Sequence, residues 1–314
     1  MVLIGVWIHP SSLNTRERVM EVADIVAQVP MTKLVVLVKD GNGKLFFKYG
    51  RHKPEYDYLR DLIEVAKDRS LEVHAWFVVL REGGEVPRGW LAENTRYAVV
   101  DERGRPVGWI CPSHEEARKR VLDLFRSLLD EYEVDGIHLD YIRYPEPVMA
   151  KGCFCDQCGK EGYLNEEWVM RGVSHVDTLV EETYELVKEY GVELSAAVFP
   201  NYPECIIGVR QDWGKWVDQG LLDWVAPMNY TNIMSVFNVR SMIHVSMIPE
   251  GILLLEGIGK KSSVSSLSPG KMIRQAEAAV KAGADGVVVF SYGSLTEKDL
   301  KLLRIFRARC RFSS

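Results

Sequence analysis

Chemistry is concentrated at one point of the sequence, where an apolar run ends in polar and aromatic side chains. Residues 134–145 read VDGIHLDYIRYP, so Asp140 directly follows a stretch typical of a buried strand. A carboxylate is costly to bury without partners, and this position therefore favours a functional role for Asp140. The alternation of a strand places His138 on the same side, one layer deeper, where it either orients the carboxylate or simply fills the core.

Two candidate partners for Asp140 are found at the ends of other apolar runs. Glu256 lies in the run at residues 252–258, and Asp40 follows the run at residues 33–39. Two carboxyl groups about 5–5.5 Å apart, or about 6.5–9.5 Å apart, can hydrolyse a glycosidic bond with retention or inversion. Glu256 is equally well explained as a salt-bridged structural residue, and Asp40 as half of a surface ion pair with Lys39.

Aromatic and hydrogen-bonding side chains occur at the ends of the same apolar runs. Aromatic rings stack on the apolar faces of sugars, while amide, lysine and arginine side chains bind hydroxyl groups. The residues predicted to bind substrate in this way are Trp7, His9, Lys39, Trp76, His138, Arg143, Asn229, Tyr230 and Tyr292. The expected partner is an oligosaccharide or a glycoside.

A cluster of cysteines follows the run that ends at residue 140, and its members are Cys153, Cys155 and Cys158. Thiols in this spacing can surround one metal ion, and a structural zinc site requires four ligands. Cys111 is the preferred fourth ligand, because the predicted helix after it leads into residues 134–140; His114 and Cys205 are the alternatives. Four thiolates would close the site, so the zinc is expected to be structural. Free thiols or a redox pair form the competing interpretation.

The elements that must position these residues alternate along the whole chain. Short runs rich in Val, Ile and Leu are predicted strands, at residues 2–9, 33–39, 71–80, 134–140, 192–199, 224–230, 252–258 and 286–292. Amphipathic segments between and after them are predicted helices. This order predicts an α/β fold with one (β/α)8 barrel domain over residues 1–314. A doubly wound open sheet is the alternative, but the turn after the first strand lacks a Gly-x-Gly-x-x-Gly sequence.

Two insertions are predicted at the carboxyl ends of the third and fourth strands. Residues 81–112 contain a hairpin with its turn near Arg103 and Gly104, and residues 146–164 form a cysteine-rich loop. The carboxyl ends of barrel strands carry the active site in enzymes of this fold. Both insertions are therefore expected to lie beside Asp140.

Composition narrows the class of protein further. The chain has 314 residues, a net charge of −5 and 47% apolar residues, with a pI near 5.9. This charge argues against binding to nucleic acid or to an anionic membrane surface. No apolar run approaches the roughly 20 residues of a membrane span, and the first residues do not resemble a secretion signal. We therefore expect a soluble, cytoplasmic protein.

The motif VDGIHLDYIRYP resembles the hallmark of the glycoside-hydrolase-like family 10 proteins, which have (β/α)8 barrels. Further similar segments are GVW at residues 5–7, CPSHEEAR at 111–118, DW at 212–213, PMNYT at 227–231 and FSYG at 290–293. The resemblance implies a sugar-active barrel centred on Asp140. The cysteine cluster is in turn similar to the zinc site of some family-42 β-galactosidases.

These observations together predict a glycoside hydrolase that cleaves O-glycosidic bonds with a pair of carboxylates at the rim of the barrel. Asp140 is the expected nucleophile or general acid, and Glu256 or Asp40 its partner. A carbohydrate-binding barrel without hydrolytic activity is the first alternative. A zinc-dependent hydrolase that uses the cysteine cluster is the second.

Overall fold

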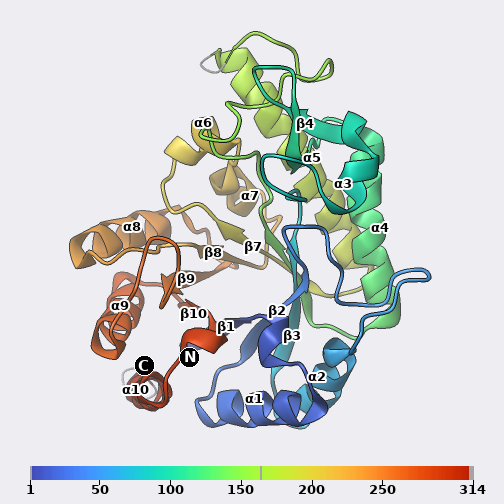
Figure 1. Cartoon of the computed structure of the whole chain (residues 1–314). Helices are drawn as coiled ribbons and strands as arrows, with labels where there is room; N and C mark the ends of the chain where they lie inside the picture. Colours follow the sequence, from blue (N-terminus) through green and yellow to red (C-terminus); the bar gives the residue numbers. More distant parts are fainter. Residues whose placement is uncertain (1, 163–164, 311–314) are drawn as a thin grey trace.

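The computed structural model describes residues 2–162 and 165–310. Within them, eight parallel strands close into a barrel in the order β1-β10-β9-β8-β7-β6-β3-β2 (Figure 1). The strands are β1 (Leu3–Ile8), β2 (Lys33–Lys39), β3 (Glu72–Val78), β6 (Gly136–Asp140), β7 (Glu193–Val198), β8 (Trp224–Pro227), β9 (Leu253–Gly259) and β10 (Gly286–Phe290). The prediction of a (β/α)8 barrel is confirmed.

Helices surround the barrel in Figure 1 and cover the outer faces of its strands. The longer ones are α1 (Arg16–Gln28), α2 (Tyr58–Lys67), α4 (Glu115–Glu131), α5 (Glu166–Glu189), α8 (Met234–Met247), α9 (Pro269–Ala282) and α10 (Glu297–Cys310). Short helices are α3 (Gly89–Glu93), α6 (Glu204–Val209) and α7 (Trp213–Asp218), with 3₁₀ turns at Pro10–Ser12, Thr95–Tyr97 and Tyr292–Ser294. Among the described residues, every helix is too short or too polar to span a bilayer.

Each barrel strand divides its side chains between two layers, because successive residues point to opposite faces. In β9, Leu255 packs inside the barrel, whereas Leu254 and Ile258 pack against the helices. Glu256 is paired in register with Val287, which belongs to the outer layer. The strand therefore directs Glu256 toward the helices and away from the barrel axis.

The two insertions lie against each other at the carboxyl end of the barrel. The first contains the antiparallel strands β4 (Ala98–Val100) and β5 (Pro106–Ile110). The second begins after Asp140 and contacts this hairpin through a hydrogen bond from Phe154 N to Val100 O of 2.9 Å. Residues 163 and 164, at the end of the predicted cysteine-rich loop, lie outside the described residues.

Polar side chains fix the opposite, amino end of the barrel. Asp135, Asp223 and Asp285 each precede a strand, and each accepts a backbone N–H from the start of a neighbouring strand at 2.7–2.9 Å. These bonds hold strands at defined heights around the barrel, because they satisfy donors that the parallel ladder leaves free. Asp135 thus serves the fold.

Candidate active site

A cavity of about 1080 Å³ opens at the carboxyl ends of the strands. Of the residues predicted to act on or bind substrate, those that line it are Trp7, His9, Asp40, Trp76, Asp140, Arg143 and Tyr230. They come from five different strands or the loops that follow them. The structure therefore brings these seven residues to one site, at the end of the barrel where this fold places catalysis.

Asp140 is the last residue of β6 and is only 6% exposed. Its Oδ2 accepts a hydrogen bond from Trp76 Nε1 at 3.0 Å, and its Oδ1 accepts one from Tyr141 N at 2.8 Å. Burial raises the pKa of Asp140 to about 6, and the nearby Arg143 guanidinium opposes that rise only in part. A carboxyl group with this pKa can hold and release a proton near neutral pH, which is what a general acid requires.

Two further carboxylates line the cavity, and the structure gives them different surroundings. Asp40 Oδ1 accepts hydrogen bonds from Asn42 N at 2.8 Å and Lys44 N at 2.9 Å. Glu146 Oε1 forms an ion pair of 2.9 Å with Arg143. Arg143 therefore lies between Asp140, whose pKa it influences, and Glu146, which it contacts directly.

Aromatic rings form the apolar surface of the cavity. Tyr230 and Phe290 stack with their centroids 5.7 Å apart, and Trp7 meets both rings edge-on. His9 packs edge-on against Trp76 at 5.1 Å, and burial lowers the pKa of this histidine. Such a surface can stack against the apolar face of a sugar ring, in the way the aromatic strand ends predict.

Glu256 is not brought to the cavity. It is fully buried in the layer between barrel and helices, where its Oε1 lies 2.7 Å from His244 Nδ1 of α8. Lys39 is also absent from the lining, because the pairing of β2 with β3 shifts between Leu37 and Lys39. Its ammonium instead binds Val78 O at 2.8 Å and Glu82 Oε1 at 3.2 Å.

Three other residues predicted to bind substrate lie outside the lining. His138 is buried beneath Trp7, whose Nε1 donates to His138 Nε2 at 3.2 Å, and burial holds the pKa of His138 well below its usual value. Asn229 donates its side-chain amide to Phe237 O at 3.0 Å. Tyr292 lies in the 3₁₀ turn after β10. His138 supports the site through its contact with the lining residue Trp7.

Several lining residues were not predicted from the sequence. They include Phe46, Arg81, Tyr141, Glu146, Phe199, Arg240 and Phe290. Arg81 comes from the first insertion and lies over the ring of Tyr141 at 5.4 Å. Glu146 follows the hallmark motif by one residue. Tyr141 lies within that motif and Glu146 directly after it, and this position was the available signal for both. No periodic pattern marks Arg81.

The four cysteines Cys111, Cys153, Cys155 and Cys158 form a second cluster beside the cavity, with all four Sγ atoms within 4.8 Å of one another. Cys205 is not part of it. A tetrahedral zinc with bonds of about 2.3 Å holds its sulfurs about 3.8 Å apart, and Cys111 Sγ lies 3.5 Å from Cys158 Sγ. The donor set therefore fits a metal ion. Burial raises the pKa of the Cys111 and Cys153 thiols, whereas a bound cation would oppose this effect and favour their thiolate forms.

The cysteine cluster touches the segment that enters the cavity. Tyr144 Oη lies 3.5 Å from Cys111 Sγ and 3.7 Å from Cys158 Sγ. The preceding residue, Arg143, lines the cavity, and its carbonyl accepts a hydrogen bond from Trp109 Nε1 at 2.9 Å. The cluster can thus fix the loop after β6 without contributing an atom to the cavity.

The fold and the cavity together define a (β/α)8 barrel with a carboxylate-bearing site at its rim, and comparison with known proteins gives its family. The family model described as Glycosyl hydrolase-like 10 matches residues 37–262. The chain belongs to this family.

Two relatives agree with this assignment, and a solved structure shares the fold. Glycosyl hydrolase YngK of Bacillus subtilis (strain 168) is 26% identical over 209 residues, which are 57% of this chain and 40% of that protein. Glycosyl hydrolase DigH of Escherichia coli (strain K12) is 25% identical over 208 residues, 56% of this chain and 47% of that protein. The chain spans less than half the length of these relatives. The fold is similar to that of the PgaB (BpsB) glycoside hydrolase domain from Bordetella bronchiseptica, with a TM-score of 0.74, 11% identity, and coverage of 97% of this chain and 98% of that one.

Proposed function

We propose that the protein is a glycoside hydrolase with Asp140 as its general acid. The observation that carries this proposal is a buried carboxyl group, with a pKa raised to about 6, that lines an aromatic cavity. An acid with this pKa can donate its proton to the leaving oxygen of a glycosidic bond near neutral pH. Family membership and the two relatives named as glycosyl hydrolases support the same reaction class.

Hydrolysis requires a second carboxylate, and Asp40 and Glu146 are the candidates that line the cavity. In the proposed reaction Asp140 protonates the glycosidic oxygen, and the leaving group departs with that proton. The second carboxylate either attacks the anomeric carbon or removes a proton from the attacking water. Asp40 was a predicted partner of Asp140, and Glu146 takes the place of Glu256 as the other candidate.

The size and lining of the cavity support an oligosaccharide as substrate. Its volume of about 1080 Å³ slightly exceeds the range of about 300–1,000 Å³ for small-molecule sites. Trp7, Trp76 and Tyr230 offer ring faces for stacking, and Arg143 offers donors for hydroxyl groups.

Replacement of Asp140 tests this function directly. Asp140→Asn cannot donate a proton, so we expect kcat to fall by about 10²–10⁴-fold on whichever aryl glycoside or oligosaccharide the wild-type protein hydrolyses. Asp24→Asn, at a half-exposed position in α1, is the control and should leave kcat unchanged.

Unchanged turnover in Asp140→Asn would end the assignment of the acid. Sugar affinity without turnover in the wild-type protein would instead identify a carbohydrate-binding barrel. The same assay on Asp40→Asn and Glu146→Gln, with azide added as an external nucleophile, separates the two candidates for the second carboxylate. Of these two variants, the one that has lost the nucleophile should form a glycosyl azide whose anomeric configuration is opposite to that of the substrate.

We further propose that the four clustered cysteines bind one structural zinc ion. Four thiolates complete a tetrahedral shell, so the metal would stabilise the loop after β6 and leave hydrolysis to the carboxylates. Metal analysis of the purified protein should give one zinc per chain, lost in Cys111→Ser and retained in Cys205→Ser, which changes a buried cysteine outside the cluster. A cobalt-substituted protein whose spectrum shows fewer than four thiolates would favour an open, catalytic metal site instead.

A further inference from the structure

Glu256 and His244 form a fully buried pair behind the wall of the cavity. Glu256 points from β9 into the helix layer, and His244 meets it from α8 with an Oε1 to Nδ1 distance of 2.7 Å. Both side chains are 0% exposed. Neither lines the cavity, so neither can touch a substrate bound there.

His244 lies between two hydrogen-bond acceptors. Its Nε2 is 2.8 Å from Pro200 O, on the side of the ring away from Glu256. A neutral imidazole has one N–H and can donate to only one of them. Both hydrogen bonds can form in two ways. An imidazolium can donate to the Glu256 carboxylate and to Pro200 O at once, or a neutral imidazole can donate to Pro200 O and accept a hydrogen bond from a Glu256 carboxylic acid.

The contact with Pro200 reaches the wall of the cavity. Phe199, Pro200 and Asn201 line the cavity after β7. Proline has no N–H, so its carbonyl is the one backbone group through which Pro200 can be held by a hydrogen bond. His244 occupies that carbonyl.

The residue before Pro200 is held from the same side of the wall. Phe199 N donates to Gln211 Oε1 at 2.8 Å, and Phe199 O accepts from Trp213 Nε1 at 3.0 Å. Trp213 also packs edge-on against the His244 ring, with the centroids 5.8 Å apart. On the cavity side, the Arg143 guanidinium lies 4.7 Å from the centre of the Phe199 ring. The wall is thus fixed from behind and meets a residue of the proposed active site in front.

We propose that His244 and Glu256 are positioning residues that hold the wall at residues 199–201 in the shape the substrate requires. The role in catalysis rests on the proposed glycoside hydrolase activity, whereas the fixing of the wall does not. Glu256 thereby contributes to the site through His244 and Pro200, although the strand directs it away from the cavity.

Three variants test this role. Glu256→Gln keeps the shape of the pair, because its amide can donate to Nδ1 while the Nε2–H of a neutral His244 still donates to Pro200 O. Glu256→Leu and His244→Leu remove the support. Asp299→Asn is the control, since it weakens another buried ion pair, with Lys260 at 2.9 Å, that does not involve the wall.

Two measurements are made on each variant. Hydrogen exchange followed by mass spectrometry reports on the backbone amides of Phe199, Asn201 and Tyr202 without any substrate. Steady-state kinetics on the aryl glycoside that the wild-type protein turns over fastest give KM and kcat. In both leucine variants we expect the exchange rate and KM each to rise at least about fivefold, because small displacements of a binding wall weaken binding. In Glu256→Gln both quantities should stay close to the wild-type values.

Two results would overturn the inference. Exchange at these wall amides that is no faster in the leucine variants than in Asp299→Asn would reduce the pair to a contributor to global stability. A loss of about 10²–10⁴-fold in kcat in Glu256→Gln, with exchange as in wild type, would make Glu256 itself a catalytic residue. Faster exchange in a protein that hydrolyses no glycoside would support the positioning of the wall and remove the proposed function.

Discussion

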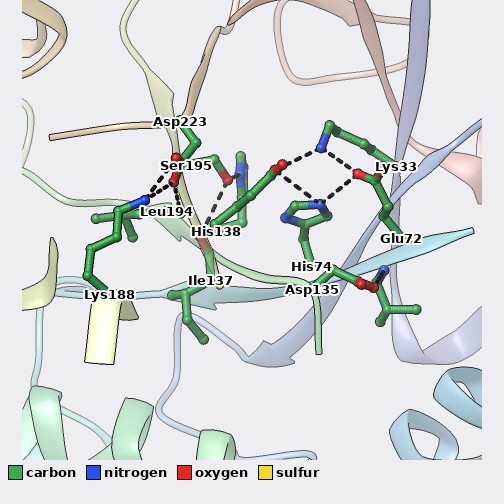
Figure 2. A network of polar contacts seen from close by, with 12 residues as sticks. Lys33, Glu72, His74, Asp135, Ile137, His138, Lys188, Leu194, Ser195 and Asp223 are labelled. Atoms are coloured by element: carbon green, nitrogen blue, oxygen red, sulfur yellow. Dashed lines mark hydrogen bonds and ion pairs between the residues drawn. The ribbon is translucent and has the colours of Figure 1, made fainter. Parts of the chain in front are cut away.

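The two ends of the barrel treat carboxylates in opposite ways. At the amino end, the Lys33 ammonium bridges Glu72 Oε2 at 2.5 Å and Glu193 Oε2 at 2.8 Å, and His74 Nε2 lies 3.6 and 3.8 Å from the same oxygens (Figure 2). Contact with His74 and the ion pair with Lys33 lower the pKa of Glu72 to about 2. The carboxylates at this end are matched with cations.

At the carboxyl end, Asp140 is not paired with a cation in the described part of the chain. Within residues 2–162 and 165–310, its oxygens accept only from the Trp76 indole and a backbone N–H. Burial raises its pKa from 3.8 to about 6. Such a shift corresponds to about 3 kcal/mol against the charged form.

Because the two ends differ in this way, a single strand carries stabilising residues at its start and residues of the proposed active site at its end. β3 carries His74 near its start and Trp76 two residues later, so one strand serves the ion cluster below and the proposed acid above. In the same way, Asp135 just ahead of β6 pins a neighbouring strand, whereas Asp140 at its end faces the cavity. A carboxylate left without a cation lowers stability but gains a pKa suited to proton transfer.

The largest effect is expected from breaking the amino end. Lys33→Met leaves two carboxylates together without their cation, and removal of one partner from a buried pair costs about 3–5 kcal/mol. Glu72 and Glu193 are 43% and 39% exposed, so water screens part of the repulsion between them. We therefore expect the free energy of unfolding, measured in urea, to fall by about 2–3 kcal/mol. The variant should retain wild-type turnover per folded molecule.

The matched control for this change is Lys67→Met, which removes a lysine from an exposed pair with Glu133. Its effect on the free energy of unfolding should be close to zero, because water screens an exposed ion pair. Equal losses in the two variants would contradict the view that the amino end is built for stability. A loss of turnover in folded Lys33→Met would contradict the separation of the two ends.

The fold and the position of Asp140 could be predicted because both follow from repetition. Eight apolar runs alternate with amphipathic segments, and a carboxylate at the end of a strand in a parallel barrel must lie at the rim. The metal site could also be predicted, because three of its cysteines lie within six residues of the sequence. The structure brings Cys111 to these three.

The side on which Glu256 lies could not be predicted, because its strand is apolar on both faces. In the sequence LLLEGIG, Leu254 packs outward and Leu255 inward, so no polar alternation marks the inner face. Lys39 was predicted to bind substrate, and the position of its side chain outside the lining could not be foreseen for another reason. The register shift at the end of β2 places it opposite Phe77 of the outer layer, and such an irregularity has no signature in the sequence.

A smaller effect, of opposite sign, is expected at the carboxyl end. Between pH about 4 and 6 folded Asp140 keeps a proton that the unfolded chain has released, because its pKa is raised from 3.8 to about 6. The free energy of unfolding therefore decreases as the pH rises through this window, and the full penalty applies above it. Asp140→Asn removes the charge and should stabilise the protein at pH about 8. The gain should be about 1–2 kcal/mol, less than the full shift implies, because the asparagine NH₂ cannot accept a hydrogen bond from the Trp76 indole.

The pH dependence of that gain tests the comparison most closely. Urea unfolding of wild type and Asp140→Asn across pH about 4–8 should give a stabilisation of the variant that decreases as the pH falls. Near pH about 4 it should become a small destabilisation, because folded wild-type Asp140 is then protonated and only the lost hydrogen bond from Trp76 remains. Glu72 works in the other direction, since its lowered pKa makes its contribution disappear as the pH falls from about 4.5 toward 2. A stability difference between the two proteins that does not change with pH would show that Asp140 is ionised throughout. It would then fit a nucleophile rather than an acid, and the two ends of the barrel would differ less than their contacts indicate.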